Sequence, residues 1–297
     1  MKTMRIGYFA DGPWAHLTLV KLLSDETLEV VFVCARDDVP DPVLRSKSAE
    51  KSLKFITHPN INSKEFLEQM RAFDCDLHVS MSFNQIFRHE LIQLPPLKTI
   101  NCHAGKLPFY RGRNILNWAL INDEKEFGIT VHYVDEGIDT GDIILQRCFP
   151  ITDDDNYSTL LKSAYEGCAS TLYDAIKVVQ SNNVKPIVQT KIHPLGFYCS
   201  ARSEGDEQLD WNQKSRDIFN FVRAICRPGP EARTFLGDKE IKINRVQYLP
   251  DAPVYKGVVG AVVGLDNNSF FVKTSDSYIK VTEYSGCSRP RMGDRLR

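Results

Sequence analysis

The chain has 297 residues, of which 42% are hydrophobic and 25% charged, a composition that excludes disordered and fibrous proteins. Its 37 basic and 38 acidic residues leave a net charge of −1, so no overall field draws it to nucleic acid or to an anionic membrane. The N-terminus lacks a signal-peptide pattern, and no apolar run reaches the roughly 18 residues of a membrane span. We therefore expect a cytoplasmic protein that binds neither nucleic acid nor membrane.

Strand and helix patterns alternate through the first part of the chain. This alternation indicates an α/β fold with a doubly wound, mostly parallel sheet, which we assign to residues 1–183 as a catalytic domain. The expected strands are 5–10, 29–35, 76–82, 98–103, 127–134 and 142–149, and the expected helices are 14–24, 63–73 behind an N-capping Ser63, and 158–180.

The second part of the chain changes character. Residues 184–206 are irregular, and a helix is expected from Asp210 to Cys226, where the sequence Arg-Pro-Gly-Pro stops it. We expect a connector with this helix over 184–230 and a small C-terminal antiparallel β module over 231–297. The β-rich runs of that module are 233–236, 240–248, 255–263, 270–273 and 278–283.

The turn after the first strand and the spacing of the cysteines disfavour two kinds of site. This turn reads Asp11-Gly12-Pro13-Trp14, without the Gly-x-Gly-x-x-Gly of a nicotinamide site, and Pro13 lacks a backbone N–H that a phosphate would use. The turn could still hold a pyrophosphate more loosely. The eight cysteines are scattered singly, so we expect reduced thiols and no metal site.

Three polar residues stand out as a candidate catalytic set. Asn101 and His103 lie two positions apart at the end of an expected strand, so their side chains share a face at the carboxyl edge of the sheet. Cys102 between them faces the core and is a poor nucleophile candidate. A lone histidine is more often structural, but here Asn101 accompanies it and an acidic loop containing Asp139 lies between two later strands.

An amide, an imidazole and a carboxylate without a protein nucleophile suit attack by a substrate amine on an activated carbonyl. Asn101 and His103 would donate to the developing oxyanion, an effect worth about 3–4 kcal/mol per donor. His103 could also relay the amine proton, and Asp139 would orient the imidazole and raise its basicity.

The motifs around these residues resemble the folate-dependent formyltransferase family. That family includes the glycinamide ribonucleotide, methionyl-tRNA and nucleotide-sugar formyltransferases. The resemblance covers residues 4–243, because 209–212 and 225–228 are similar to the connector of the tRNA and sugar branches. The matching motifs are residues 101–113, Asn117-Trp118, 128–132, 134–141 and 142–146.

This resemblance implies 10-formyltetrahydrofolate as the formyl donor and assigns the catalytic roles to Asn101, His103 and Asp139. It also implies that two segments cradle the pterin, mostly through backbone groups. The residues concerned are Ser82, Phe83 and Asn84 in the first segment and Val134, Asp135, Gly137 and Ile138 in the second.

Other residues have both a functional and a plain interpretation. Arg111 and Arg113 are either a solvated turn or contacts for an anionic acceptor. Trp14, next to Gly12, is either a core aromatic residue or a lid over the diphosphate and sugar of the substrate. His132 is expected to be structural.

For the acceptor, the tail looks short for a tRNA enzyme and the first loop lacks the glycine-rich sequence of the glycinamide ribonucleotide branch. These features favour a dTDP- or UDP-linked amino sugar, with dTDP-4-amino-4,6-dideoxyglucose as the closest match, formylated for lipopolysaccharide O-antigen synthesis by a homodimer. A methionyl-tRNA formyltransferase, a folate-binding sensor and a formyl-folate hydrolase remain alternatives.

Overall fold

The computed structural model describes residues 3–297, and the chain divides into two compact units. Because each unit consists of several segments, this division does not test the domain boundaries predicted after residues 183 and 230. The first unit comprises residues 3–112, 127–149 and 162–199, and the second comprises 113–126, 150–161 and 200–297.

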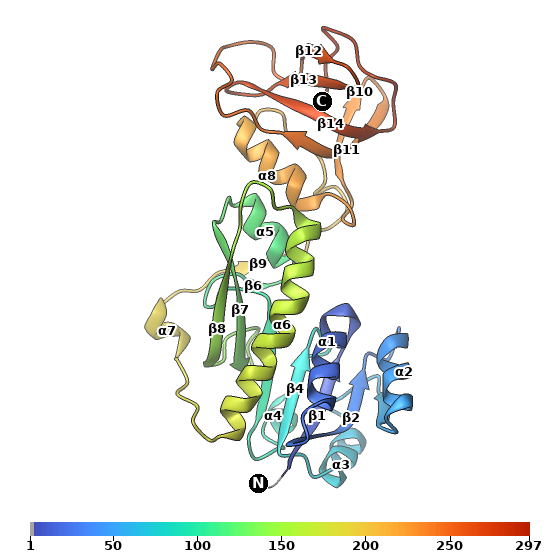
Figure 1. Ribbon diagram of the computed structural model, residues 1–297, viewed down its shortest axis with the longest axis vertical. Coiled ribbons are helices and arrows are strands. Elements are labelled where there is room, and N and C mark those ends of the chain that lie inside the picture. The colour runs from blue at the N-terminus through green and yellow to red at the C-terminus, as the bar shows by residue number, and fades with distance from the viewer. Residues whose placement is uncertain (1–2) are drawn as a thin grey trace. The chain divides into compact units, whose positions relative to one another are not determined.

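A seven-stranded sheet in the order β3-β2-β1-β4-β5-β7-β8 forms the centre of the first unit (Figure 1). Strands β1 to β5 pair in parallel, and β7 joins β5 antiparallel. The predicted mostly parallel α/β sheet is therefore confirmed. The strands are β1 Met4–Ala10, β2 Leu28–Ala35, β3 Lys54–Thr57, β4 Leu77–Met81, β5 Thr99–His103, β7 Glu126–Tyr133 and β8 Ile143–Pro150.

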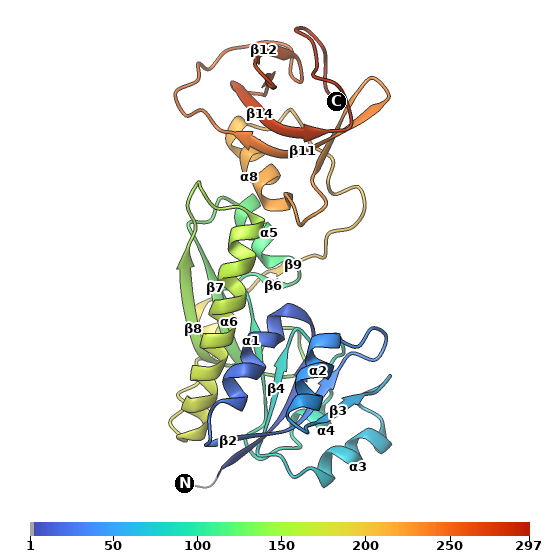
Figure 2. The same cartoon turned by 45° about the vertical axis from the view of Figure 1, so that its right-hand side comes forward.

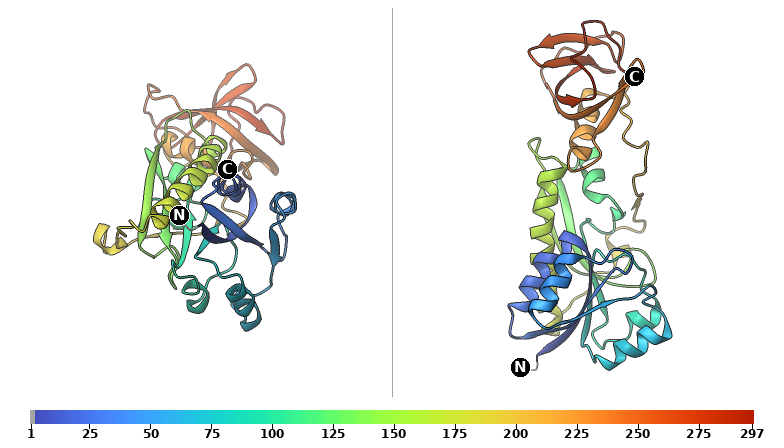
Figure 3. Two further views of the ribbon diagram at one scale, coloured as in Figure 1. Left: turned by 60° about the horizontal axis from the view of Figure 1, so that its bottom comes forward. Right: turned by 90° about the vertical axis from the view of Figure 1, so that its right-hand side faces the viewer.

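Helices cover both faces of this sheet, as the right-hand view of Figure 3 shows for α1 on one side and α3 on the other. Alternation along β1 explains the two layers, because Tyr8 donates its hydroxyl to Ala15 O of α1 while Phe9 packs against Phe66 of α3. The helices are α1 Gly12–Leu23, α2 Pro42–Glu50, α3 Lys64–Ala72, α4 His89–Ile92, α6 Tyr157–Gln180 and α7 Gln189–Ile192.

Local sequence explains why several of these helices begin where they do. The predicted Ser63 cap is present, since its hydroxyl accepts from Phe66 N at 3.2 Å. The carboxylate of Asp41 caps α2 in the same way by accepting from Leu44 N at 2.7 Å. Helix α2 was nevertheless not predicted, because it buries little beyond Leu44 and has no apolar stripe for a periodicity argument.

The second unit contains two helices and a five-stranded antiparallel sheet in the order β10-β11-β14-β13-β12, so the predicted C-terminal β module is confirmed (Figure 2). Helix α8 packs beside strand β11 and contributes buried Ile218 and Val222. The elements are α5 Ile115–Ile121, α8 Ser215–Ile225, β10 Ala232–Leu236, β11 Lys239–Gln247, β12 Val262–Asp266, β13 Ser269–Lys273 and β14 Tyr278–Ser285.

Two predicted elements of this unit are shifted. Helix α8 begins at Ser215 and not at Asp210, because the Asp210 carboxylate accepts from Asn212 N and forms a turn instead. The predicted strand 255–263 is displaced to Val262–Asp266. Val254 and Val258 before it are exposed, so this apolar run does not mark a buried strand.

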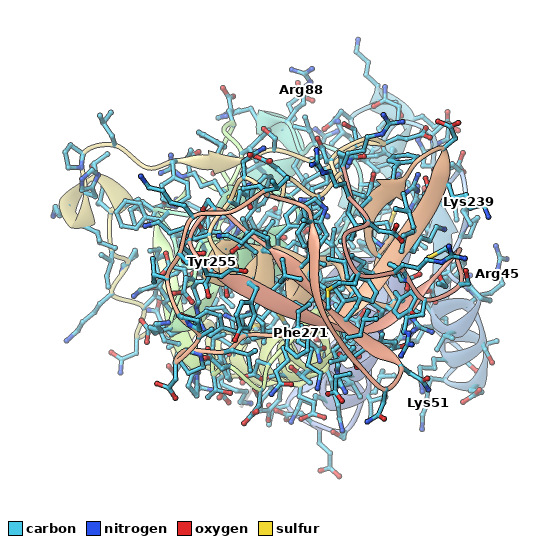
Figure 4. The ribbon with its side chains drawn as sticks, turned by 90° about the horizontal axis from the view of Figure 1, so that it is seen from above. Arg45, Lys51, Arg88, Lys239, Tyr255 and Phe271 are labelled. Carbon is cyan, nitrogen blue, oxygen red and sulfur yellow. The ribbon has the colours of Figure 1, made fainter. Side chains whose placement is uncertain are left out.

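Figure 4 labels several side chains of the two units. Tyr255 and Phe271 both pack edge-on against Tyr278, with ring centroids 6.4 and 5.6 Å away. Arg45 and Lys51 at α2 are exposed, and the Arg45 guanidinium lies 4.6 Å from the Phe55 ring. Aromatic packing therefore extends to the loop that precedes β12.

Candidate active site

Strands β5 and β7 bring the candidate residues together. Asn101 and His103 project from the same face of β5, while the Cys102 thiol is buried on the opposite face, 3.9 Å from Cys168 O. The antiparallel register sets His132 of β7 directly opposite Asn101. Asp139 lies in the loop between β7 and β8, with a positive φ of 54°.

The four polar side chains form one cluster. Asp139 Oδ2 lies 3.6 Å from His103 Nδ1, and its Oδ1 lies 3.5 Å from His132 Nε2. Asn101 Nδ2 is 3.3 Å from the same His132 nitrogen, and Gly112 N donates to Asp139 Oδ2 at 2.9 Å. The side chains of His103 and Asp139 are only 10% and 11% exposed, so little water separates them.

Hydrogen-bond partners show which nitrogen carries the proton in the His103 and His132 rings. His103 Nε2 lies 2.7 Å from Tyr110 O, and since a carbonyl can only accept, Nε2 carries the proton. His132 Nδ1 likewise donates to Tyr133 O at 2.7 Å, which leaves its Nε2 to accept from Asn101 Nδ2. The second N–H of the Asn101 amide remains for a substrate oxygen.

The loop after β5 passes close to the His103 ring. A Cβ added at Gly105 would lie 2.4 Å from His103 Nε2 and 2.5 Å from Tyr110 O. Only glycine allows the chain to pass this close to the ring. The small Gly105 singled out in the sequence thus leaves room for the His103 ring beside Tyr110 O.

The pKa shifts of His103 and Asp139 suit proton transfer. Burial lowers the pKa of His103, although the charge of Asp139 acts in the opposite direction, so the ring is neutral at pH 7. Burial alone would raise the pKa of Asp139, but the positive charge that the two imidazoles carry when protonated, together with the Gly112 N–H, outweighs burial and holds that pKa well below its usual range. A neutral base beside an ionised carboxylate can accept a proton and have the resulting charge stabilised.

One residue of this cluster and one beside it were not assigned to the site from the sequence. His132 was expected to be structural, yet it contacts both Asn101 and Asp139. The register of two antiparallel strands decides this, and a single sequence does not specify it. Gln189 falls in the stretch expected to be an irregular connector, but its buried amide donates to Asp139 O at 2.9 Å and to Gly141 O at 2.8 Å.

The two predicted anion-binding arginines differ. Arg111 lies beside the cluster, where its guanidinium donates to Gln189 Oε1 at 2.7 and 3.2 Å and lies 5.4 Å from the Tyr198 ring. Arg113 belongs to the second unit and is exposed. The geometry therefore groups Arg111 with the polar cluster, and the role of Arg113 stays a prediction.

The first loop holds Gly12 at the start of α1, with a positive φ of 64°, and the half-buried Trp14 shortly after it. The Trp14 indole meets the Tyr165 ring of α6 edge-on at 4.7 Å. Packing against a helix agrees with the core interpretation of Trp14, and its exposed part leaves the lid interpretation open to experiment.

Part of the second predicted donor segment lies at one of two adjoining pockets of about 310 and 510 Å³, which share His89 and Glu136 as lining residues, whereas Ser82, Phe83 and Asn84 line neither pocket. Val134 and Asp135 line the smaller pocket. The larger one is lined by Ile86 to Leu91, a segment that the sequence did not assign, although Ile86 is 64% exposed. Ligand pockets combine apolar walls with a few polar groups, and this lining contains both.

The remaining predicted donor residues shape the surrounding loops. Ser82 adopts a positive φ of 56°, and the Phe83 ring packs on Phe9 with centroids 5.6 Å apart. Asn84 Nδ2 lies 3.4 Å from Asp38 Oδ1. In the second segment, the Asp135 carboxylate accepts from Gly137 N and Thr140 Oγ1, and Ile138 is 55% exposed.

Two further features bear on the class of protein. Within residues 3–297, no group of three or more histidine, cysteine, aspartate or glutamate side chains could hold a metal ion. The helices in that same range are too short or too polar to cross a bilayer.

Comparison with known families now identifies the chain. The sequence model described as formyl transferase matches residues 4–176, more than half of the chain. The chain belongs to the formyl transferase family. A second model, the C-terminal domain of formyl transferases, matches residues 202–293. Tail length therefore does not separate this member of the family from enzymes that carry the full C-terminal domain, and the expectation of a short tail is corrected.

Individual formyltransferases agree with this assignment. The methionyl-tRNA formyltransferase of Halalkalibacterium halodurans is 31% identical, over 96% of this chain and 91% of that protein. Crystal structures of the sugar 3N-formyl transferase WlaRD and of an N-formyltransferase from Helicobacter canadensis have TM-scores of 0.67 and 0.63. They are 21% and 20% identical, over 97% and 96% of this chain and all of theirs. These structural likenesses establish the fold.

Proposed function

We propose that this formyltransferase transfers the formyl group of 10-formyltetrahydrofolate to the free amine of a nucleotide-linked amino sugar. The observation that carries the proposal is the buried cluster of Asn101, His103 and Asp139, which lacks a protein nucleophile because Cys102 faces away. The acceptor itself must then attack the formyl carbon. Our best candidate acceptor is dTDP-4-amino-4,6-dideoxyglucose, for O-antigen synthesis.

In the proposed reaction the acceptor nitrogen attacks the formyl carbon, and the bond from that carbon to N10 of the folate breaks. The free N–H of the Asn101 amide stabilises the oxyanion that develops on the formyl oxygen. His103 takes the proton that the amine loses, and N10 gains one as tetrahydrofolate leaves. Asp139 stabilises the imidazolium that forms in between.

The donor would bind at the pockets lined by Val134, Asp135 and the segment from Ile86 to Leu91, beside the loop that carries Asp139. Family membership supports a formyl-folate in this role. The WlaRD structure contains 5-N-formyl-THF with dTDP, and the Helicobacter structure contains folinic acid with dTDP-3-aminofucose.

The charge of the C-terminal module bears on the choice between a small acceptor and a polyanion. Residues 231–297 contain eleven basic and eight acidic residues, and the whole chain carries −1. A tRNA enzyme gains much of its affinity from basic side chains that neutralise phosphates. A nucleotide diphosphate needs only one or two such contacts, and Arg111 beside the cluster is suited to one of them.

Methionyl-tRNA is the second candidate acceptor, and the relative from Halalkalibacterium halodurans favours it, as do further relatives of that name at 27 to 32% identity. Steady-state assays with 10-formyltetrahydrofolate and either dTDP- and UDP-linked amino sugars or charged initiator tRNA distinguish the two. We expect turnover with at least one sugar nucleotide. Turnover with the charged tRNA alone would overturn the sugar assignment.

A further inference from the structure

A segment that we call the strap, residues 187–199, crosses the candidate site in the first unit. It begins with the short helix α7 and ends in strand β9, Tyr198–Cys199, which pairs in parallel with β6, Arg111–Gly112. Gln189 at the start of α7 is 2% exposed and therefore faces inward, although the helix as a whole is polar.

The Gln189 amide joins two parts of the site. Its Oε1 accepts from Arg111 Nε and Nη2 at 3.2 and 2.7 Å. Its Nε2 donates to Asp139 O and Gly141 O at 2.9 and 2.8 Å. Since all four contacts use both ends of one amide, the group is fully engaged and has no capacity left for a ligand.

Backbone hydrogen bonds also join strand β6 to the Asp139 turn and to the strap. Gly112 N donates to the Asp139 carboxylate, and Arg111 N donates to Phe197 O of the strap at 3.1 Å. Gly112 adopts a φ of 95°, and a Cβ there would lie 2.5 Å from Cys199 O. The strap, strand β6 and the Asp139 turn therefore form one interlocked frame.

We propose that Gln189 is a positioning residue, which holds the Asp139 turn against His103 and keeps Arg111 turned toward the site. This inference rests on the proposed formyl transfer at the same site. Asp139 has a positive φ of 54°, in the left-handed region that aspartate tolerates in turns, and the two donated hydrogen bonds hold this turn in place. Without the two donated hydrogen bonds, the Asp139 and Gly141 carbonyls would lose their partner and the turn would relax.

No charged or apolar side chain of similar length can replace this amide. Methionine has nearly the same shape but neither donates nor accepts comparably. Glutamate would still accept from Arg111, but it would set a carboxylate against the carbonyls of Asp139 and Gly141. Gln189→Met therefore removes both functions, and Gln189→Glu removes only the donating one.

The first test follows His103 by NMR as the pH is varied, in the wild type, Gln189→Met and Gln189→Glu. A nearby carboxylate raises the pKa of an imidazole, so displacing Asp139 should lower the pKa of His103 by about 0.5–1 unit in the methionine variant. This measurement needs no acceptor and stays valid even if the assignment of the acceptor fails. An unchanged His103 titration in a folded methionine variant would overturn the inference.

The second test is kinetic. We expect kcat to fall at least about tenfold in both variants, with the KM for formyl-folate little changed, because an effect on His103 alters proton transfer more than binding. In the methionine variant the KM for the acceptor should also rise, since Arg111 is released, whereas the glutamate variant should keep it. Equal changes in both KM values would instead indicate a general structural defect and overturn the inference.

A matched control is present in the same unit. Gln180 also donates its amide to a backbone carbonyl, that of Thr27, at 2.9 Å, but it lies at the end of α6 and outside the cluster. Gln180→Met should leave kcat, both KM values and the His103 titration as in the wild type. If it lowers kcat as much as Gln189→Met, the loss does not come from the frame around Asp139.

Discussion

At the scale of single residues, chemistry depends on a few atoms whose positions the sequence only partly specifies. Asn101, His103 and Asp139 were identified because they sit in long motifs at the end of a strand and in an acidic turn. His132 and Gln189 were not assigned to the site, because strand register and a returning connector bring them there. Long-range pairing of this kind leaves no local pattern in the sequence.

The first residue-scale prediction concerns the histidine and the carboxylate. His103→Ala and Asp139→Ala should each lower turnover by at least about 100-fold, the usual size of a general-base contribution. Steady-state formyl transfer with saturating donor measures this loss. A near-normal rate in either variant would reject the role assigned to that residue.

Cys102→Ala serves as the control for these variants. Its thiol lies between the two candidate residues in sequence but is buried on the opposite face, and burial raises its pKa well above the usual range. The variant should keep turnover within about threefold of the wild type, since only transition-state contacts change the rate strongly.

At the scale of elements, periodic sequences were the most informative. Strands β1, β2, β4 and β5 and helices α3 and α6 agree with their predicted ranges to within a few residues, because each has an alternating or helical apolar pattern or a cap. Helix α5 has no such pattern, since most of its residues are buried all around, and it was missed. Helix α8 and strand β12 begin later than predicted, because turns and loops occupy the residues before them.

An arginine ties three segments of the second unit together. Arg216 of α8 forms ion pairs with Asp123 and Asp153, with N–O distances of 2.5 and 2.7 Å. Because both carboxylates are a third or more exposed, Arg216→Met should cost only about 1 kcal/mol at pH 7. Thermal unfolding measures this difference. Arg147→Met, which breaks a single exposed pair with Asp174, should cost less.

The pH dependence of this difference has a definite sign. The Arg216 hydrogen bond lowers the pKa of Asp123 from 3.8 to about 2. A carboxyl group whose pKa is lowered in the folded state contributes its full stabilisation at pH values above its ordinary pKa. It loses this contribution as the pH falls through the lowered pKa. The gap in melting temperature between wild type and Arg216→Met should therefore shrink between about pH 4 and pH 2. A gap that stays constant would contradict the assignment.

At the scale of the whole molecule, the class of reaction is better determined than the acceptor. The family follows from the sequence model that matches residues 4–176, and the fold agrees with a structure that covers nearly the whole chain. Acceptor choice depends on side chains that converge from separate segments and on weak differences in charge. Tail length does not distinguish the acceptors, because the C-terminal domain of the family matches over residues 202–293.

The central claim is that an acceptor amine, and not water, receives the formyl group in the cluster of Asn101, His103 and Asp139. The most direct test is a single-turnover reaction with 10-formyltetrahydrofolate and dTDP-4-amino-4,6-dideoxyglucose, in which tetrahydrofolate, formamide product and formate are all quantified. We predict one N-formylated sugar nucleotide for each tetrahydrofolate released, with no formate above the acceptor-free background. Formate in place of the formamide, at a rate unaffected by the acceptor, would contradict the account.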